Sequence, residues 1–380
     1  MKILVVNWQD WTHPRAGGAE FHLREVFRRI AARGHRVDLL CTAFDGAARE
    51  ERLDGINVIR RGGAYSLFNY VVPNVWRRVL RRHDYDVVVD DLNKVPFVTP
   101  LYVDRPVVAL VHHLFGETIF QETNPLFGSY LWLSERPVPW IYRRSHFIAV
   151  SDSTADDLVA RGVARERIAV IPNGLPDLDW SSILALPKSP DPVFVYLGRL
   201  KRYKRLDLAL EAIARVAARH PEAGLVIAGE GSHRSALERH AEDLGLGDRV
   251  DFTGWVSDDE KWALLRRAWA LVYTSPKEGW GIGSLEAQRV GTIALVSDAP
   301  GLRDTVVDGV TGRVLPHGDV AALAAAMEEA IERPERRRAM EEAAVRRAAR
   351  YSWDDAAEGT LAVLERAIAE SRSGSGAVVP

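Results

Sequence analysis

The sequence has a single cysteine, Cys41, and this scarcity excludes two kinds of stabilising site. One thiol cannot form an intrachain disulfide framework or supply the ligands of a cysteine-based zinc site. Long apolar runs are also missing. The apolar run in the opening segment MKILVVNWQD is too short for a signal peptide. No apolar stretch approaches the length needed to span a membrane. These absences predict a cytoplasmic protein whose membrane contact, if any, is peripheral and at the inner face.

Net charge is nearly absent as well. The chain carries 50 lysines and arginines against 52 aspartates and glutamates, for a formal net charge of −2. Such a balance gives no signal for a nucleic-acid partner. Apolar residues, in contrast, make up 47% of the 380 positions, which is enough for two domains of ordinary size with a core in each.

The first strand–helix–strand unit lacks the glycine pattern of a dinucleotide-binding site. Residues 3–6 predict a buried parallel strand, and residues 19–32 predict a helix that ends at Gly34. The loop between them has no G-x-G-x-x-G and ends instead in Gly17-Gly18-Ala19-Glu20. The second strand carries no acid at its end to bind a ribose. The parallel-sheet class therefore stands, whereas binding of NAD is excluded.

Apolar runs alternate with helical periods along the chain, which predicts an α/β protein with two doubly wound parallel sheets. The expected strands are residues 3–6, 37–40, 58–60, 87–89, 107–111, 147–150 and 168–171, then 193–197, 225–228, 250–252, 270–273 and 293–296. We expect an N-terminal Rossmann-like domain (1–175), a linker (176–192), a C-terminal Rossmann-like domain (193–352), a helix (353–370) and a flexible tail (371–380). Because ligands of such sheets bind at the carboxyl ends of the strands, two facing sheets would form a cleft.

Candidate phosphate-binding residues follow the first strand of the second half. Arg199 comes directly after this strand, and Lys204 precedes the next helix. An arginine fork and a lysine point charge can together hold a diphosphate, and a solvated basic turn is the alternative. Gly229, after the following strand, either allows close approach of a ligand to the backbone or is a plain turn residue.

The most informative stretch is TSPKEGWGIGSLEAQRVG, residues 274–291. Glu278 lies on a glycine-rich loop, and Gly281, Ile282 and Gly283 lead into a helix that contains Glu286. Free N–H groups at the start of a helix favour an anion. A phosphate there, with hydroxyls near the two carboxylates, would suit a sugar nucleotide. A solvated turn with two surface glutamates is the alternative.

His112 is the candidate site residue of the first half. It follows the expected strand 107–111, a position typical of an active site, but a hydrogen-bonded structural histidine is equally consistent with it. His112 and His113 have no third ligand at a suitable spacing, so no metal site is expected.

A helical segment of the first half carries a basic stripe beside an aromatic residue: Trp76, Arg77, Arg78, Arg81 and Arg82. This stripe could bind anionic lipid or a phosphate-bearing acceptor, and a solvated helix face is the alternative.

In their order, these motifs resemble the retaining GT-B glycosyltransferases of glycosyltransferase family 4, over nearly the whole chain to about residue 370. The matching residues are Gly17-Gly18-Ala19-Glu20, His112, Ala149-Val150-Ser151, Ile171-Pro172-Asn173-Gly174, Gly198-Arg199-Leu200 with Lys204, Gly229-Glu230-Gly231, and the block from Glu278 to Glu286 with Gly291-Thr292. The last block is the most specific. The resemblance implies two Rossmann-like domains facing a cleft, a nucleotide-sugar donor, no cofactor and no metal ion.

The resemblance also assigns roles by position. It implies that Arg199 and Lys204 bind the donor diphosphate, that Glu278 contacts the transferred sugar, and that Glu286 binds the ribose. His112 would contact the donor sugar near the reacting carbon. The remaining donor-side residues are Gly18, Gly229, Val256 beside the base, Gly281, Ile282 and Gly283. The expected catalytic residues are His112, Arg199, Lys204 and Glu278.

The implied reaction moves a hexose, with retention, from a UDP- or GDP-sugar to a glycan, lipid-linked or small-molecule acceptor, in polysaccharide or glycoconjugate biosynthesis. Arg199, Lys204 and a helix N-terminus would stabilise the leaving diphosphate without a metal ion. Two rival readings remain: a nucleotide-sugar epimerase of the same fold, and a non-catalytic two-domain sugar-binding protein.

Overall fold

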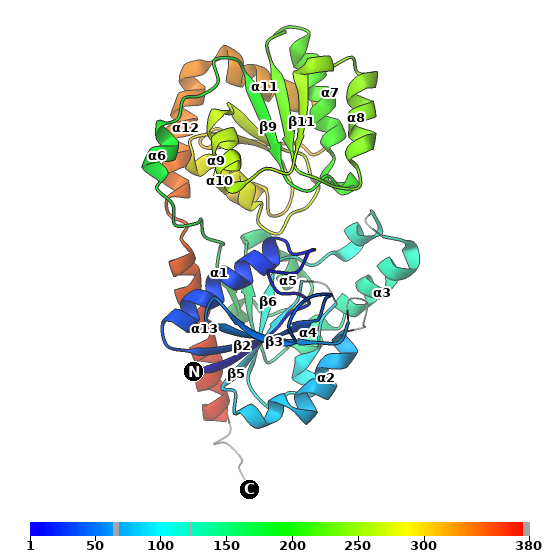
Figure 1. The fold of residues 1–380 in the computed structure, drawn as a ribbon, viewed down its shortest axis with the longest axis vertical. Helices are drawn as coiled ribbons and strands as arrows, with labels where there is room; N and C mark the ends of the chain where they lie inside the picture. The colour runs from blue at the N-terminus through cyan, green and yellow to red at the C-terminus, as the bar shows by residue number, and fades with distance from the viewer. Residues whose placement is uncertain (64–67, 94, 122, 375–380) are drawn as a thin grey trace. The chain divides into compact units, whose positions relative to one another are not determined.

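The computed structural model describes residues 1–63, 68–93, 95–121 and 123–374, and the chain divides into two compact units. Unit 1 comprises Met1–Gly174 and Ser352–Pro380, and unit 2 comprises Leu175–Tyr351. Each unit is a parallel sheet with helices on both faces (Figure 1). The predicted fold class, an α/β chain with two doubly wound parallel sheets, is confirmed.

The sheet of unit 1 has the order β3-β4-β2-β1-β5-β6-β7-β8. Its strands are β1 (Lys2–Val6), β2 (Arg36–Thr42), β3 (Glu50–Leu53), β4 (Ile56–Arg61), β5 (Val87–Asp91), β6 (Val107–Val111), β7 (His146–Ala149) and β8 (Ile168–Val170). All neighbours are parallel except β3 and β4, which form a hairpin. The sequence did not indicate β3, because its residues EERL are polar and half exposed.

Helices cover both faces of this sheet. They are α1 (Gly18–Ala32), α2 (Phe68–Arg78), α3 (Pro125–Glu135), α4 (Val138–Ile141), α5 (Asp152–Ala160) and α13 (Trp353–Gly374). The apolar cores hold α1 and α13 on one face and α2, α4 and α5 on the other. Short 3-10 helices in the two units are η1 (Leu80–His83), η2 (Thr99–Leu101), η3 (Gly116–Gln121), η4 (Arg165–Arg167), η5 (Arg202–Lys204), η6 (Gly247–Arg249) and η7 (Arg303–Thr305).

The basic stripe on α2 and η1 corrects one prediction. Trp76 is only 3% exposed and packs in the core beside Tyr85, so its ring cannot contact a membrane. The four arginines of the stripe are exposed: Arg77, Arg78, Arg81 and Arg82. The stripe therefore loses its tryptophan to the core, and the apolar side chain exposed among the arginines is Val79, at 41%.

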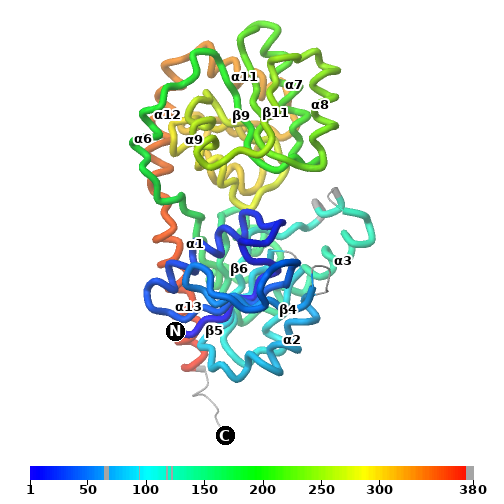
Figure 2. The backbone as a smooth tube through the Cα atoms, in the orientation of Figure 1, coloured from blue at the N-terminus to red at the C-terminus, as the bar shows by residue number. Residues whose placement is uncertain are grey.

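The C-terminal helix α13 completes unit 1. Figure 2 shows this red helix lying among the blue and cyan elements of the unit. Trp353 is fully buried at its start, Asp354 pairs with Arg29 at 3.3 Å, and Glu370 lies 3.0 Å from His146. The helix continues through Gly374, beyond residue 370 where the sequence placed its end. The rest of the expected tail, 375–380, lies outside the described residues.

The sheet of unit 2 has the order β11-β10-β9-β12-β13-β14, and all its strands are parallel. They are β9 (Val193–Leu197), β10 (Gly224–Ala228), β11 (Val250–Gly254), β12 (Ala270–Tyr273), β13 (Ile293–Ser297) and β14 (Gly312–Leu315). The helices are α6 (Trp180–Ala185), α7 (Leu206–Ala217), α8 (Arg234–Asp243), α9 (Asp258–Arg267), α10 (Ile282–Arg289), α11 (Val320–Glu332) and α12 (Pro334–Ala348). The sequence did not indicate β14.

Residues 176–192, expected to be a linker with little structure, are packed onto unit 2. They contain α6, where Trp180 meets Trp262 of α9 edge-on at 5.1 Å. Further along, the Lys188 ammonium donates to the Thr292 hydroxyl at 2.6 Å. Prolines in this stretch thus shape a packed segment. Among the helices of the described ranges, none combines the length and apolarity needed to cross a bilayer.

Candidate active site

The site residues predicted in unit 2 gather where the winding of its sheet reverses. Strands β9 and β12 are neighbours, with β10 and β11 on one side and β13 and β14 on the other. The loops after β9 and β12 therefore leave the sheet edge in opposite directions and open a crevice between them. Lys204 lies on the first loop and Glu278 on the second.

Lys204 and Glu278 form a direct ion pair across this crevice. Their side chains are only 15% and 19% exposed, and the Ser275 hydroxyl donates to the same Glu278 oxygen at 2.7 Å. Burial alone would lower the pKa of Lys204, but the adjacent Glu278 carboxylate outweighs it and raises that pKa. The crevice therefore holds a permanent, poorly solvated cation, which is the electrostatic requirement for binding an anionic group.

The β12 end also fixes the loop that carries Lys204. The Thr274 hydroxyl lies 2.9 Å from the Lys204 carbonyl oxygen and 2.8 Å from that of Arg205. Arg199, at the start of the same loop, is exposed. The predicted pair of cations thus consists of one buried, oriented ammonium and one guanidinium at the surface.

Backbone geometry at the start of α10 explains two of the predicted glycines. Gly281 caps the helix with φ of +64°, a left-handed conformation that favours glycine. A side chain at Gly283 would place its Cβ 2.1 Å from the Tyr273 hydroxyl, which itself donates to the Leu197 carbonyl at 2.6 Å. The first turn of α10, including Ile282, is thereby held against β9 and β12. Its N–H groups are suited to an anion at the crevice.

Glu286, one turn into α10, has a partner that the sequence did not indicate. Its carboxylate accepts from the Lys261 ammonium of α9 at 3.1 Å. Burial raises the pKa of Glu286, although the charge of Lys261 works against that effect.

The β11–α9 loop, which holds Val256, leads into helix α9. Trp255 on this loop is 78% exposed.

Gly229 ends β10 beside the Lys204 loop. Its N–H donates to the Gly254 carbonyl at 2.7 Å, so it ties the ends of β10 and β11 together. The predicted donor-side residues of unit 2 therefore occupy the carboxyl ends of four adjacent strands, β11, β10, β9 and β12.

In unit 1, His112 follows β6 and is 7% exposed. Its Nε2 lies 3.5 Å from Asp91 Oδ1, and its backbone carbonyl accepts from the Thr154 hydroxyl at 3.0 Å. The ring meets His22 edge-on at 4.9 Å. Burial of the ring lowers the pKa of His22 to about 3, and the electrostatic interaction with the nearby His112 acts in the same direction. His22 is therefore neutral at physiological pH. Its Nδ1 lies 2.7 Å from Asn173 Oδ1.

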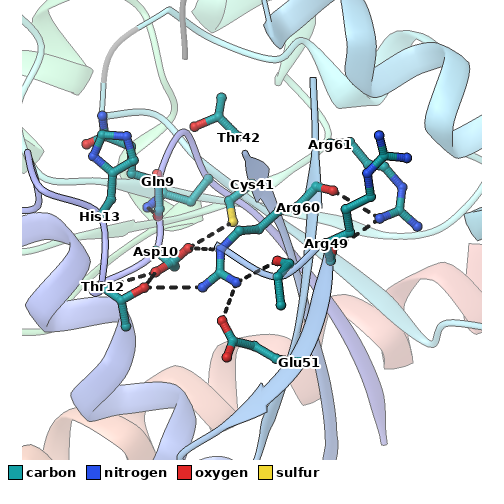
Figure 3. A network of polar contacts seen from close by, with 12 residues as sticks. Gln9, Asp10, Thr12, His13, Cys41, Thr42, Arg49, Glu51, Arg60 and Arg61 are labelled. Carbon is teal, nitrogen blue, oxygen red and sulfur yellow. Dashed lines mark hydrogen bonds and ion pairs between the residues drawn. The ribbon is translucent and has the colours of Figure 1, made fainter. Parts of the chain in front are cut away.

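The β1–α1 loop, which ends at Gly18, is held by a buried ion network that the sequence did not indicate (Figure 3). Arg60 of β4 donates to Asp10 at 2.7 Å and to the Thr12 hydroxyl at 3.2 Å, and it also pairs with Glu51. Burial tends to raise the pKa of Asp10, but hydrogen bonds from Arg60 and Thr12 prevail and lower it. The bonds from Arg60 to Asp10 and Thr12 thus hold the first half of this loop in place.

Gly18 begins α1 and is exposed. A Cβ at this position would meet no atom within 4 Å, so packing of the fold does not require a glycine there. Glu20 accepts from the Gly17 N–H at 2.8 Å and caps the helix.

The structure thus joins Lys204 to Glu278 and places Gly281, Ile282, Gly283 and Glu286 on one helix, whereas His112 and Gly18 belong to unit 1. Within the described ranges, no group of three histidine, cysteine, aspartate or glutamate side chains is placed to hold a metal ion.

Two family models match the chain, one in each half. The model described as "Glycosyltransferase Family 4" matches residues 16–177. The model described as "Glycosyl transferases group 1" matches residues 184–347. Together they cover the strands of both sheets except β1.

Similar proteins cover the chain almost end to end. The D-inositol 3-phosphate glycosyltransferase of Geodermatophilus obscurus is 30% identical over 406 residues, covering 96% of this chain and 88% of the relative. The glycogen synthase of Mycobacterium tuberculosis is 26% identical over 398 residues, covering 96% and 94%. The crystal structure of Anabaena HepE in complex with UDP and glucose has the same fold, with a TM-score of 0.75 at 20% identity over 96% of this chain and 100% of that one.

Proposed function

This chain belongs to glycosyltransferase family 4, and from that premise we propose that it transfers a hexose from a UDP- or GDP-sugar with retention of configuration and without a metal ion. Membership of the family makes this protein a GT-B glycosyltransferase that uses a nucleotide sugar. The stereochemistry, the metal independence and the residue roles below are the proposal.

The observation that carries the proposal is the part-buried Lys204–Glu278 pair at the switch point of unit 2. Breaking a sugar–phosphate bond leaves a nucleoside diphosphate with growing negative charge. A lysine already desolvated and oriented stabilises that charge at little reorganisation cost. When the donor binds, its diphosphate replaces the Glu278 carboxylate as the partner of Lys204. Glu278 is then free to accept hydroxyls of the sugar.

Other groups share this work. The exposed Arg199 side chain is free to fold over the diphosphate, and the first turn of α10 offers N–H groups to a phosphate oxygen. Glu286, held by Lys261, binds the ribose, and Val256 and Gly229 line the nucleotide. In unit 1, His112 contacts the donor sugar and Gly18 leaves room on the phosphate and acceptor side.

For retention we propose same-face attack by the acceptor in place of a double displacement on a carboxylate nucleophile. With the donor bound, Glu278 accepts from the Ser275 hydroxyl and from hydroxyls of the sugar, and we propose it in that role and not as a nucleophile. The acceptor oxygen therefore attacks the anomeric carbon from the face that the diphosphate leaves. The bond between the anomeric carbon and the donor phosphate oxygen breaks as the new glycosidic bond forms. The proton of the acceptor hydroxyl passes to the leaving phosphate.

Donor base and acceptor are proposed only as classes. HepE was crystallised with UDP and glucose, which supports UDP-glucose as the first donor to test. The relatives are named for D-inositol 3-phosphate and glycogen, so acceptors range from small molecules to glycans, and a lipid-linked acceptor belongs to the same set. A cytoplasmic site of action, at the inner face of the membrane, completes the proposal.

The test is transfer and donor hydrolysis by the full chain with UDP- and GDP-sugars in EDTA. Lys204→Ala should lower kcat by about 100–1000-fold, because it removes a buried donor to the leaving group. Arg199→Ala should lower kcat as well. Lys201→Ala, a change on the same loop at a lysine that bonds only Ser232 among the contacts seen, is the matched control and should stay near normal.

Near-normal kcat in both the Lys204 and Arg199 variants would contradict the mechanism, as would activity that requires an added divalent ion. Proton NMR of the product anomer checks retention. Conversion of the donor without any acceptor would favour an epimerase, and tight binding without turnover would favour a sugar-binding protein.

A further inference from the structure

Helix α3 exposes far more apolar surface than a helix of a soluble domain normally does. Its sequence is PLFGSYLWLSE, and only Gly128, Leu131 and Glu135 are buried. Leu126 is 84% exposed and Leu133 is 57% exposed, and they lie on the same side of the helix because they are seven positions apart. A helix that is apolar all round is ordinarily enclosed by protein or lipid. Figure 1 shows α3 standing out from the body of unit 1.

Segments that adjoin α3 in sequence also expose apolar side chains. Phe127 is 49% exposed on α3, Phe120 is 43% exposed in η3, and Trp140 is 65% exposed on α4. We call these residues, with Leu126 and Leu133, the α3 surface. Exposed apolar side chains in such a cluster mark a site of interaction, whereas single ones do not.

The charge around the α3 surface is positive. Glu135 is the only acid between Thr123 and Ser145, and it is turned inward. Its carboxylate accepts from the N–H groups of Phe115 and Gly116 at 2.7 and 2.9 Å. Arg136, Arg143 and Arg144 are all exposed, so the charge that solvent or a partner meets beside this surface is basic.

Two of these arginines lie over tryptophan rings. The Arg136 guanidinium is 3.7 Å from the Trp132 ring centroid, and that of Arg143 is 5.4 Å from the Trp140 ring. An indole beside a cation suits the boundary between lipid headgroups and acyl chains, where the ring sits among headgroups and the cation meets phosphate.

We propose that the α3 surface docks this protein on an anionic lipid membrane. Leu126, Phe127 and Leu133 enter the headgroup–acyl boundary, and Arg136, Arg143 and Arg144 bind lipid phosphates. A protruding helix with exposed leucine and phenylalanine side chains, flanked by arginines, suits the surface of an anionic bilayer. On α2 and η1 the tryptophan beside the arginines is buried, and the exposed apolar side chains there are Tyr70 and Val79; α3 exposes more apolar surface, with Leu126, Phe127 and Leu133, and is therefore the inferred contact. This inference does not depend on the transfer reaction.

Cosedimentation with vesicles tests it. The full chain is mixed with phosphatidylcholine vesicles that contain or lack phosphatidylglycerol. Binding should require the anionic lipid, and the double variant L126D/F127D should reduce the membrane partition coefficient at least about tenfold by removing the inserted apolar groups. The double variant V307D/V310D, which places the same two charges at valines of unit 2 that are 43% and 50% exposed, is the matched control and should bind like the parent.

Three outcomes would overturn the inference. One is failure of the parent chain to bind either vesicle. Another is normal binding by L126D/F127D with loss only when Arg77, Arg78, Arg81 and Arg82 are all changed to alanine, which would assign the contact to the α2 stripe. The third is self-association of the parent in gel filtration that L126D/F127D abolishes without vesicle binding, which would make α3 an interface between copies. Donor binding and circular dichroism of the variants establish that they are folded.

Discussion

The loop that enters α1 and the loop that enters α10 each present the N-terminus of a helix, but they are built in different ways. Side chains hold the first: Asp10, Thr12 and Glu51 converge on Arg60 (Figure 3). Backbone holds the second, where Gly283 lies against Tyr273 with no room for another atom. The difference shows that a loop can be fixed by buried charge or by the absence of side chains.

The two constructions fail in opposite ways. A loop held by charges is damaged when one charged group is removed, because its partner is left buried and unpaired. A loop held by close packing of glycine is damaged when atoms are added. The following predictions use these opposite sensitivities, beginning with the largest expected effect.

Arg60→Met should destabilise unit 1 by about 3–5 kcal/mol, because Asp10 remains buried without its partner. Hydrogen exchange of the unit 1 core amides in increasing urea measures this for the unit by itself. Arg61→Met is the matched control on the same strand. It removes a more exposed pair with Glu50 and should cost at most about 1 kcal/mol. Equal losses in the two variants would mean that the network does not hold the loop.

Gly283→Ala should cost about 2 kcal/mol of unit 2 stability and lower donor affinity, because its Cβ would meet the Tyr273 hydroxyl at 2.1 Å. Tyr273→Phe removes that oxygen and leaves the nearest ring carbon at 3.1 Å. The double variant should therefore be more stable than the sum of the single changes indicates. A double-mutant cycle in urea measures this coupling, and strictly additive losses would contradict the packing explanation.

The last prediction, the smallest when expressed per pH unit, concerns how the stability of unit 1 depends on pH. His22 has a folded pKa of about 3 against an ordinary value of 6.5, so the unfolded chain binds a proton that the folded chain does not. Stability of unit 1 should therefore be greatest above pH 6.5 and fall as the pH drops toward 3, by about 1 kcal/mol between pH 6 and pH 5 from this group. His22→Gln should remove that part of the slope, and His83→Gln, near the surface of the same unit, should not. An unchanged slope in the His22 variant would refute the assignment.

Much of the fold and part of the site could be predicted from sequence. Alternating apolar runs gave both sheets, and position after a strand singled out Arg199, Lys204 and His112. The pairing of Lys204 with Glu278 was not predictable, since the two residues are 74 positions apart and either could face solvent. The same holds for Lys261 with Glu286, 25 positions apart. Contacts between distant charges depend on helix rotation and loop path, which local patterns do not encode.

The failures have similar causes. Trp76 was placed with the arginines of α2 because they are adjacent in sequence, yet the helix turns the ring inward and the charges outward. The Arg60 network was missed because a charged residue near a strand end is usually exposed, whereas this one is buried among partners from two segments, the β1–α1 loop and β3.

The placement of α13 in unit 1 has a consequence for synthesis of the chain. Unit 2 is one continuous segment, Leu175–Tyr351, and is complete once that segment has left the ribosome. Unit 1 begins first but lacks the fully buried Trp353, and the Asp354 and Glu370 carboxylates that contact Arg29 and His146, until α13 emerges. The usual order, in which the N-terminal domain folds first, is therefore reversed at the final step. A ribosome that stalled before Trp353 emerged would hold a complete unit 2 beside an unfinished unit 1.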